Sequence, residues 1–599
     1  MPAKKATAIT PFVLLDDARA QDASDARLYE NPVRIITAHD SAELHSALKE
    51  LDRAQAAGLH AAGYFSYEAG YALEQRLEPL LPANSKALCW FAFFESYRPL
   101  VPHDIPAWLA ERKSGEGAVY NAAPDISFPA YHAAYAEVQR AIRAGDIYQA
   151  NLTYKLAGQY AGDPFAIYAA YRASAGAGYG GMIYDGTDWL LSFSPELFFT
   201  AYRGEITARP MKGTVQRHAN PAEDDKAVKA LQANEKDRAE NLMIVDLLRN
   251  DISRVAETGS VHVPHLFAIE SYPTVHQMTS TVKARLAKDK TPADILRAIY
   301  PCGSITGAPK IRAMETLAGL ERSPRGPYCG SMGRIDADGD AAFNVAIRTL
   351  RLDTPTKTAT MGLGSAIVAD SDPVSEWREC ALKGAFLTGS MRKFDLIETM
   401  AFDPASGILR LEMHLERIKA SAAVLGFEFD RHAARNQIQA ACFHIEHAVK
   451  VRLMLGKAGA VAIEMQPMPK MAKGPMKVFI APLPVESDDF RLRHKTSDRD
   501  FYDNARRTAQ AQHGTDEVIF TDAKGRLTEG SFTHIFVGDA KAGYRTPPLE
   551  LGLLPGILRR EMLENGTACE AALTSADLEQ GFYIGNSLRG LMQAQFIAP

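Results

Sequence analysis

Two short segments of the sequence pair a lysine with a glutamate in a way that suits covalent chemistry. Lys212 lies in the string RPMKGT, between a methionine and a glycine, and Glu196 precedes it in SPELF. A lysine that is partly withdrawn from water loses its proton more readily and becomes a nucleophile, and a nearby carboxyl group then serves as acid or base. Taken alone, such a pair is more often a surface salt bridge.

Two predicted helices carry acidic residues on one face. Asp237 and Glu240 share a face in DRAENLMIVDLLRND, and Glu376 and Glu379 repeat that spacing in SEWRECALK, with Lys383 on the same side. Mg²⁺ takes a few carboxylates, keeps several waters and contacts an anionic substrate, so the two faces together predict a magnesium site. Each face alone is more simply a solvated helix surface.

A third segment is suited to binding an anion. Residues 301–310, PCGSITGAPK, form a loop of Gly, Ser and Thr that is predicted to lead into a helix, where backbone N–H groups are free. Its spacing is not that of a Walker A motif. Farther along, Tyr328, Arg348 and the turn GLGS at 362–365 supply a hydroxyl, a forked cation and a close backbone approach. Those groups are needed to hold a dicarboxylate.

The last third of the chain has a set of its own. Lys495, in RLRHKTSDRD, is placed among polar residues and could form a Schiff base with an aldehyde cofactor. A glutamate opposite the ring nitrogen of pyridoxal phosphate would keep that nitrogen protonated, and the string LTEGS offers Glu529. The turn LPGI, leading into a predicted helix, offers N–H groups to a phosphate, and Arg417 adds positive charge. Viewed singly, Lys495 is typical of a surface lysine.

The whole chain has the composition of an ordinary globular protein. It has 599 residues, of which 46% are hydrophobic and 23% charged, and its formal net charge is -5. Without a basic surplus, neither nucleic acid nor a membrane surface is a favoured partner. The cysteines show no CxxC pair, and no segment has the length of a signal or membrane span. These features predict a cytoplasmic protein with reduced thiols.

The elements that must position these residues predict an α+β protein of several parts. We expect a large two-sheet sandwich with outer helices, followed by a smaller α+β domain. Residues 1–125 are expected to be the N-terminal portion of the sandwich, 126–390 its catalytic portion, and 391–599 the second domain. One polar helix is expected from about Ala222 into ENLMIVDLLRND.

Eight strings of the first 390 residues, in this order, resemble the chorismate-utilising enzymes, which include anthranilate synthase component I and aminodeoxychorismate synthase component I. The strings are SPELF, RPMKGT, ENLMIVDLLRND, GSITGAPK, RGPYCGSMG, FNVAIRT, GLGSAIV and SEWRECALK. The resemblance implies that Glu240 and Glu379 bind Mg²⁺, with Asp237 and Glu376 as outer or accessory carboxylates. The implied contacts to chorismate are Thr214, His276, Ser304, Thr306, Gly307, Tyr328, Arg348, Gly362, Gly364 and Lys383.

Lys212 separates members of that family, because anthranilate synthases usually have alanine there and the aminodeoxychorismate enzymes have lysine. The resemblance then implies that Lys212 attacks the ring of chorismate, that Glu196 helps the hydroxyl depart, and that ammonia displaces the lysine. No cysteine of the chain stands in the GxCxG-like frame of a glutaminase. A separate glutamine amidotransferase, or free ammonium, is therefore the expected nitrogen source.

The second set resembles the fold-type IV pyridoxal-phosphate enzymes, which include branched-chain and D-amino-acid aminotransferases and aminodeoxychorismate lyase. The resemblance implies that Lys495 holds the cofactor and that Glu529 faces its ring nitrogen. It also implies that Arg417, Ile557 and Asn586 contact the phosphate, and that two copies of this domain can form a homodimer. In two respects the chain departs from the family: the usual N-terminal strand with its DRG and GDG motif is missing, and His534 stands where relatives often have asparagine.

The motifs alone do not separate lyase from aminotransferase, but the fusion does. A lyase that releases pyruvate from aminodeoxychorismate would act directly on the product of the first half and yield 4-aminobenzoate, a folate precursor. The alternatives are an anthranilate or other chorismate-derived synthase, or a first half that serves only as a scaffold, joined to an aminotransferase-like domain. Intact Lys212, Glu196 and acidic helices argue against the scaffold.

Overall fold

The computed structural model describes residues 9–20, 22–83, 85–218, 220–271, 275–389, 391–470, 474–579 and 581–597. The chain divides into two compact units, residues 1–391 and 392–599. This division lies beside residue 390, where a change of domain is expected from the sequence and which is itself outside the described residues. None of the helices that the structure describes is long and apolar enough to cross a membrane.

The first unit is built on two antiparallel sheets, each ten-stranded within the described residues. One sheet runs in the order β16 (Gly307–Ala308), β8 (Gln149–Gly162), β20 (Thr358–Ile367), β19 (Thr349–Asp353), β10 (Asp188–Ser192), β9 (Gly180–Tyr184), β1 (Phe12–Asp16), β2 (Ala26–Tyr29), β6 (Arg98–Leu100), with β7 (Gly117–Pro124) on β8. The other runs β13 (Met211–Gln216), β15 (Val275–Arg285), β12 (Glu205–Arg209), β11 (Leu197–Tyr202), β18 (Ala341–Asn344), β17 (Ser331–Ile335), β4 (His60–Phe65), β5 (Cys89–Phe94), β3 (Arg34–Ala38), with β14 (His262–Ser271) on β15. Strands from residues 9–125 enter both sheets, so this segment forms no sheet of its own among the described residues.

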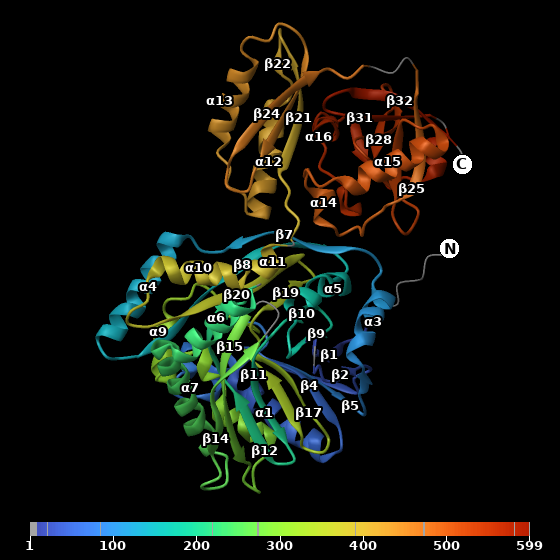
Figure 1. Ribbon diagram of the computed structural model, residues 1–599. Coiled ribbons are helices and arrows are strands. Elements are labelled where there is room, and N and C mark those ends of the chain that lie inside the picture. Colours follow the sequence, from blue (N-terminus) through green and yellow to red (C-terminus); the bar gives the residue numbers. More distant parts are fainter. Residues whose placement is uncertain are drawn as a thin grey trace. The chain divides into compact units, whose positions relative to one another are not determined.

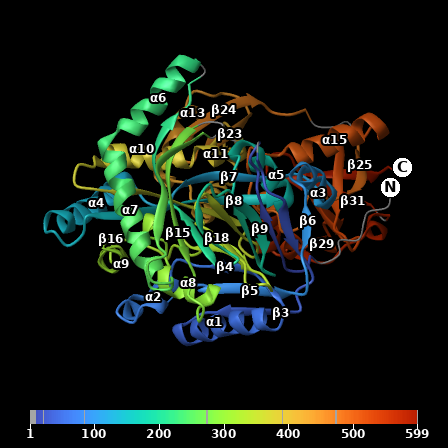
Figure 2. The same ribbon diagram turned by 60° about the horizontal axis from the view of Figure 1, so that its bottom comes forward.

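The two sheets pack face to face, and helices cover their outer faces (Figure 1, Figure 2). The inner layer joins β1, β2, β9 and β10 to β4, β5 and β17 through buried residues such as Tyr29, Trp90 and Met332. One outer face carries α3 (Ile105–Arg112), α4 (Phe128–Arg143), α5 (Pro164–Ala175), α10 (Pro373–Lys383) and α11 (Ala385–Thr388). The other carries α1 (Ser41–Ala56), α2 (Ala69–Leu73), α7 (Glu235–Ser253) and α8 (Pro292–Ile299), and α9 (Lys310–Ala318) contributes to both cores. The predicted two-sheet sandwich with outer helices is confirmed.

The long polar helix expected from Ala222 is two helices. α6 (Pro221–Ala233) ends before Asn234, and α7 begins at Glu235. The Asn234 side chain accepts a hydrogen bond from the Asp237 backbone N–H at 3.0 Å, so it caps α7. Asparagine favours such a cap because its oxygen satisfies an N–H that the helix leaves free.

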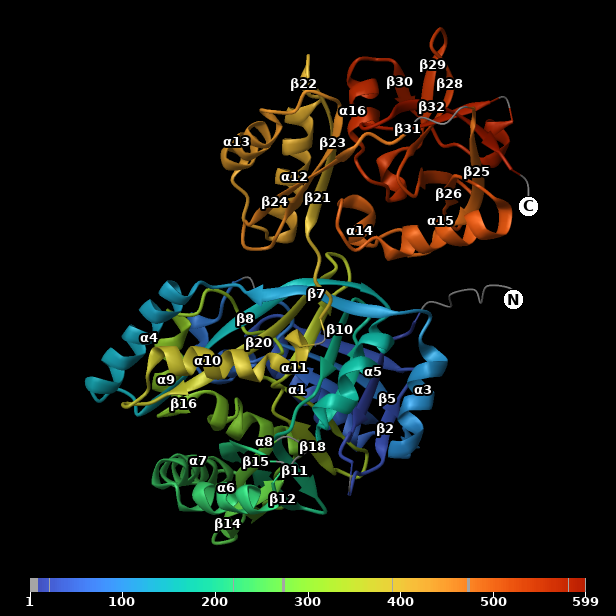
Figure 3. The same ribbon diagram turned by 45° about the horizontal axis from the view of Figure 1, so that its top comes forward.

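The second unit has a small sheet and a larger one (Figure 3). The small sheet runs β22 (Gly407–Ile408), β21 (Leu396–Asp403), β23 (Val449–Leu455), β24 (Val461–Pro467), and α12 (Leu411–Leu425) and α13 (Arg431–Cys442) accompany it. The larger sheet runs β27 (Leu527–Gly530), β26 (Glu517–Thr521), β25 (Met476–Pro482), β32 (Gly590–Phe596), β31 (Phe582–Asn586), β28 (His534–Asp539), β29 (Gly543–Thr546), β30 (Ala568–Glu570). Its helices are α14 (Phe490–Arg493), α15 (Asp500–His513) and α16 (Ile557–Glu564). Alternating burial along β23 shows one face of the small sheet turned inward.

Candidate active sites

The structure brings Glu196 into a buried position beside the residues around Lys212. Glu196 lies just before β11, and its side chain is 5% exposed. Its carboxylate accepts a hydrogen bond from Ser304 Oγ at 2.8 Å and another from the backbone N–H of Met211, the neighbour of Lys212 on β13. Two elements far apart in the sequence therefore hold one carboxyl group in place.

Burial tunes this lysine and this glutamate in opposite directions. Loss of water around Glu196 raises its pKa to about 7, although Ser304 and the charge of Lys212 oppose the change. Loss of water around Lys212 lowers the pKa of its amine, and the carboxylates Glu240, Glu196 and Glu379 partly restore it. At neutral pH a large fraction of Glu196 therefore retains its proton, and burial makes the neutral form of Lys212 more accessible than that of an exposed lysine. A neutral amine next to a protonated acid suits nucleophilic substitution.

The acidic face of α7 points at the same lysine. Burial raises the pKa of Asp237 and of Glu240, and the charge of Lys212 opposes both changes. Gly213, at φ +82°, sits against this face: a Cβ there would come within 3.0 Å of Asp237 Cβ. Glycine at this position allows β13 to approach α7 closely, which places Lys212 among the carboxylates.

The second acidic helix, α10, reaches the site through Lys383. The Lys383 Nζ forms an ion pair with Glu379 at 2.7 Å and donates to the carbonyl oxygen of Gly364 at 3.0 Å. The charge of Lys383 lowers the pKa of both Lys212 and Glu196, so this residue connects β20 with the lysine–glutamate pair. Glu376, which lies one turn before Glu379 on α10, is buried.

The carboxylates do not form a ready-made metal cage. Among the residues that the structure describes, no group of three or more His, Cys, Asp or Glu is placed to hold one ion. Mg²⁺ needs only one or two protein carboxylates when it keeps waters and takes oxygen atoms from an anionic substrate. Glu240 on α7 and Glu379 on α10, both acting on Lys212, fit that incomplete kind of site.

The loop at residues 301–310 differs from the expectation. It does not run directly into a helix: Gly303–Ile305 form a single 3-10 turn, Gly307–Ala308 pair with β8 as β16, and α9 begins only at Lys310. The cause is Gly307, at φ +147°, which packs against the backbone of Gln149 where any side chain would clash. Ser304 therefore acts through its hydroxyl on Glu196 rather than through a helix terminus. The Thr306 hydroxyl is likewise directed at backbone carbonyls.

The string GLGS at 362–365, expected to form a turn, instead lies inside strand β20, where its glycines pack against Tyr328. A Cβ on Gly362 would lie 2.0 Å from Cδ1 of Tyr328, and a Cβ on Gly364 would lie 3.1 Å from its hydroxyl oxygen. Tyr328 and Gly362 line a cavity of about 190 Å³ together with the cations Lys155 and Arg351. Lys212 and Glu196 are not among its lining residues. Arg348 lies just before β19, in the left-handed region at φ +49°.

Thr214 and His276 are hydrogen-bonded to other side chains of the protein. The Thr214 hydroxyl is exposed and donates to Gln277 Oε1 at 3.1 Å. His276 is buried, and both ring nitrogens have protein partners: Nδ1 is 2.8 Å from Ser271 Oγ and Nε2 is 2.9 Å from Asp224 Oδ1 of α6. Its contacts link β15 to α6, which is a structural role in this conformation.

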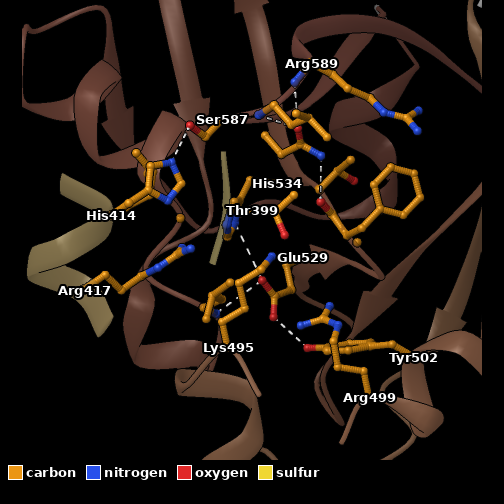
Figure 4. Close-up of a pocket in the computed structure, with 18 of the residues that line it drawn as sticks. Thr399, His414, Arg417, Lys495, Arg499, Tyr502, Glu529, His534, Ser587 and Arg589 are labelled. Atoms are coloured by element: carbon orange, nitrogen blue, oxygen red, sulfur yellow. Dashed lines mark hydrogen bonds and ion pairs between the residues drawn. The ribbon is translucent and has the colours of Figure 1, made fainter. Parts of the chain in front are cut away.

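In the second unit, the predicted residues surround one cavity of about 160 Å³ (Figure 4). Lys495 lies in the loop between α14 and α15, and its backbone carbonyl accepts from Ile397 of β21 at 2.9 Å. Burial, with the charges of Arg499 and Arg417, lowers the pKa of Lys495 to about 7. A half-neutral amine at neutral pH is what a lysine needs in order to condense with an aldehyde.

Glu529, the predicted partner of a ring nitrogen, is held by two donors. Its Oε1 accepts from the Tyr502 hydroxyl at 2.6 Å and its Oε2 from the Leu554 N–H at 3.2 Å. Burial raises its pKa to about 7. His534 faces the same carboxylate, with Nδ1 3.7 Å from Oε2, and this buried nitrogen has no hydrogen-bond partner among the residues that the structure describes. The Nε2 edge of the His534 imidazole packs directly against Gly556: a Cβ at that position would lie 2.0 Å from Nε2.

A buried ion network positions Arg417. Arg417 donates through Nε and Nη2 to the two oxygens of Glu398, at 2.8 and 2.6 Å, and through Nη1 to the Pro555 carbonyl at 3.1 Å. His414 joins the network, with Nδ1 2.6 Å from Glu398 and Nε2 2.9 Å from Ser587 Oγ. The neighbouring cations hold the pKa of Glu398 at about 2. Arg417 is thereby fixed at the edge of the cavity, near the start of α16.

The start of α16 forms the other side of this edge. Ile557 is its first residue, with Gly556 as N-cap, so its N–H has no partner inside the helix. Asn586 lines the cavity, but its side chain serves the chain itself: Oδ1 accepts from the N–H groups of Leu588 and Arg589, and Nδ2 donates to the Phe532 carbonyl. Asn586 thus shapes the turn after β31 and leaves little of its amide free for a phosphate.

These features fit an aldehyde cofactor with a ring nitrogen and a phosphate. A lysine with a lowered pKa, a buried carboxyl group, an arginine beside a helix N-terminus and an unpartnered imidazole nitrogen meet in one cavity. Sequence reasoning missed Glu398 and Tyr502. For Glu398, the available signal in the sequence was a charged residue inside the apolar strand FDLIETM. For Tyr502, the sequence offered no signal other than its position shortly after Lys495.

Comparison with known proteins finds one family model for each unit. The model of the chorismate binding enzyme family matches residues 10–389. The first unit, and with it most of the chain, is covered. The chain belongs to the chorismate binding enzyme family. A second family model, amino-transferase class IV, matches residues 395–597, the second unit.

Individual relatives of the chorismate-binding unit carry a more specific name. The chain is 37% identical over 346 residues to aminodeoxychorismate synthase component 1 of Klebsiella aerogenes, covering 53% of this chain and 74% of that protein. It is 42% identical over 254 residues to the protein of that name from Escherichia coli K12, covering 42% and 54%. Among solved structures, anthranilate synthase component I from Streptococcus pneumoniae TIGR4 aligns with a TM-score of 0.53 at 26% identity, covering 64% of this chain and 95% of that chain.

Proposed function

We propose that this chain makes 4-aminobenzoate in two steps, with one step in each unit. The chorismate-binding unit would convert chorismate and ammonia to 4-amino-4-deoxychorismate. The class IV unit would then release pyruvate from that product. The observation that carries the proposal is the buried Glu196 acting on the half-buried Lys212 in a chain whose relatives are named aminodeoxychorismate synthase component 1.

In the first step, the chain's own groups supply the nucleophile and the acid. The neutral amine of Lys212 forms a bond to the ring carbon, and the hydroxyl on the ring leaves as water with the proton of Glu196. Ammonia then displaces the lysine, whose amine is restored. Two substitutions replace one difficult one. Ser304 and the Met211 N–H keep Glu196 oriented through both.

A divalent cation has a place in this unit. Glu240 and Glu379 would hold Mg²⁺, with Asp237 and Glu376 behind them, because Glu240 and Glu379 come from two different helices and both act on the charge of Lys212. When bound, the ion would neutralise a substrate carboxylate. The remaining proposed contacts, Tyr328, Arg348, Gly362, Gly364 and Lys383, would hold the substrate's anionic groups.

In the second unit, Lys495 would hold pyridoxal phosphate and Glu529 would face its ring nitrogen. Arg417 and the N–H of Ile557 would bind the phosphate. The cofactor, when bound, supplies an electron sink for a carbanion beside the substrate amine. Lys495 would serve as the base that removes the proton from the carbon that carries that amine, and its pKa of about 7 would let it both accept and return a proton.

Ammonia would come from a separate glutamine amidotransferase subunit, since the relatives are named component 1. Free ammonium at high concentration should replace that partner.

Mass spectrometry of the products tests the proposal. Chorismate, Mg²⁺ and ammonium are incubated with the full chain, with pyridoxal phosphate present and then removed. We expect 4-aminobenzoate and pyruvate with the cofactor, and accumulation of aminodeoxychorismate without it. Anthranilate as the product would refute the first step, and unchanged chorismate would favour a scaffold. Formation of glutamate from 2-oxoglutarate and an amino acid would show an aminotransferase instead of a lyase.

A further inference from the structure

The cavity of the class IV unit carries an excess of positive charge. Glu529 is the only carboxylate among its lining residues in the described part of the chain. The cationic side chains of the lining are Arg417, Lys450, Arg491, Lys495, Arg499 and Arg589. One carboxylate does not balance six such groups, so the excess needs a partner.

Three of the six are accounted for by the unit itself. Arg417 is paired with Glu398 at 2.6 Å. Arg491 is paired with Asp489 and Asp498, at 2.7 and 3.2 Å. Lys495 is the cofactor lysine, and its lowered pKa leaves it partly neutral.

Lys450, Arg499 and Arg589 are the remainder. All three are half-buried, and none has an ion-pair partner in the part of the chain that the structure describes. Arg499 donates one hydrogen bond, from Nη2 to the Ser531 carbonyl at 2.6 Å, and its guanidinium lies 5.0 Å from the centre of the Tyr502 ring. Partly dehydrated cations without a counter-ion bind anions that enter the cavity.

The three cations line one cavity, and two of them, Arg499 and Arg589, stand at separate places in it. Arg499 lies beside Glu529 and Tyr502 at the end of the cavity where Lys495 is, and Arg589 lies at the opposite end, past Ser587 (Figure 4). Among charged groups, Arg499 is also the one that most strongly lowers the pKa of Lys495. Lys450 comes from β23 of the small sheet, on the face opposite the buried Val449 and Val451.

We propose that these residues select an amine substrate with two carboxylates, Arg499 binding the carboxylate near the amine and Lys450 with Arg589 the distant one. This proposal rests on the proposed function, because the cofactor phosphate is taken to use Arg417 and the start of α16. An amino acid with one carboxylate would leave one of the two places unpaired. The product of the first unit carries one carboxylate on the ring, across from its amine, and one on the side chain next to the amine.

Ligand binding to the full-length holoenzyme tests this selection directly. The probes are 4-aminobenzamide, 4-aminobenzoate and 4-amino-3-(carboxymethoxy)benzoate, which carry no, one and two carboxylates. Dissociation constants come from the absorbance of the bound cofactor. We expect each added carboxylate to tighten binding by about tenfold, the effect of one charge-assisted contact.

Variants that remove one positive charge show which residue is responsible for the gain in affinity from each carboxylate. Lys450→Gln and Arg589→Gln should each abolish most of the gain from the ring carboxylate and leave 4-aminobenzamide binding unchanged. Arg499→Gln should remove the gain from the second carboxylate only. Arg507→Gln and Lys524→Gln, exposed cations of the same unit outside the cavity, serve as matched controls and should behave like the unaltered chain. Arg589→Lys, which keeps the charge, should retain most of the preference.

Equal affinity for the three probes, or equal losses in the controls, would overturn the inference. Pyruvate release from aminodeoxychorismate, measured on the same preparations, separates it from the proposed function. If pyruvate is released but the probes bind without a preference for carboxylates, the proposed lyase activity stands and the proposed recognition of two carboxylates is refuted. If the preference is found but no pyruvate is released, the recognition stands and the lyase activity is refuted. Retained cofactor absorbance in each variant shows that the unit is folded.

Discussion

The hydrogen bond from Ser304 to Glu196 predicts a specific change in pH dependence. In the proposed first step Glu196 acts as an acid, so the rate follows the fraction of Glu196 that carries a proton. That fraction falls as the pH rises through its pKa of about 7. The Ser304 hydroxyl, 2.8 Å away, favours the ionised form. Ser304→Ala should therefore raise the pKa of Glu196 and extend activity to higher pH.

The magnitude follows from the strength of such a bond. A hydrogen bond to a charged group contributes about 1.5–3 kcal/mol, and about 1.4 kcal/mol corresponds to one pKa unit, so the pKa of Glu196 in the variant should be about 8 at the lower end of this range and about 9 at the upper end. With pKa values of about 7 and 8, the ratio of protonated fractions, variant over unaltered chain, is close to one at about pH 6 and about eight at about pH 8.5. The ratio of the two rates should thus rise about sevenfold over this range.

Chorismate disappearance at saturating ammonium, followed by absorbance, measures this ratio. Taking the ratio at each pH removes the ionisation of ammonia, which is common to both proteins. Thr316→Ala, which deletes a hydroxyl that donates to a backbone carbonyl on α9, is the matched control and should give a flat ratio. A flat ratio for Ser304→Ala as well would refute the assignment of Glu196 as the acid.

Further changes test the two sites separately. Lys212→Ala should abolish aminodeoxychorismate formation but leave pyruvate release from supplied intermediate; loss of both in a folded protein would contradict independent sites. Lys495→Ala should do the converse and remove the absorbance of the bound cofactor. Glu398, with its pKa lowered from 4.5 to about 2, stabilises the second unit at neutral pH, and this contribution is lost as the pH falls from about 4.5 towards 2; thermal denaturation of Glu398→Gln should show a much weaker pH dependence there. Gly362→Ala would place a Cβ 2.0 Å from a buried tyrosine ring and should raise the KM for chorismate at least about tenfold; an unchanged KM would argue that this strand does not contact the substrate.

Much of the first site could be predicted because its chemistry is local in sequence. Lys212 stands on a strand next to a glycine, and the acidic pairs of α7 and α10 share helix faces whatever surrounds them. The break at Asn234 was not predicted, because a capping asparagine inside a polar run looks like any other surface residue. Nor was β16: its two residues become a strand only because β8 passes beside Gly307.

The second site depends more on contacts between distant segments. Glu398, His414 and Ser587 form one network from three elements, and no spacing in the sequence joins them. The departure at His534 could be noticed, but its packing against Gly556 and its unpartnered nitrogen beside Glu529 are visible only in three dimensions. Tertiary packing, and not local preference, decides which polar residues face a cavity.

Burial lowers the pKa of both reactive amines, and the balance of charges around them differs. For Lys495, Arg499 and Arg417 add to the effect of burial and outweigh Glu398 and Glu529. For Lys212, the carboxylates Glu240, Glu196 and Glu379 oppose burial, and only Lys383 among the main charges adds to it. For the pair formed by Lys212 and Glu196, one shared proton can leave both groups charged or both neutral. Because burial disfavours each charged form, it shifts that balance towards the neutral amine and the protonated acid, the two forms that the substitution consumes. In a more exposed pair, water would stabilise both charges and a salt bridge would form. The lysine would then be protonated and unable to attack, and the glutamate would have no proton to donate.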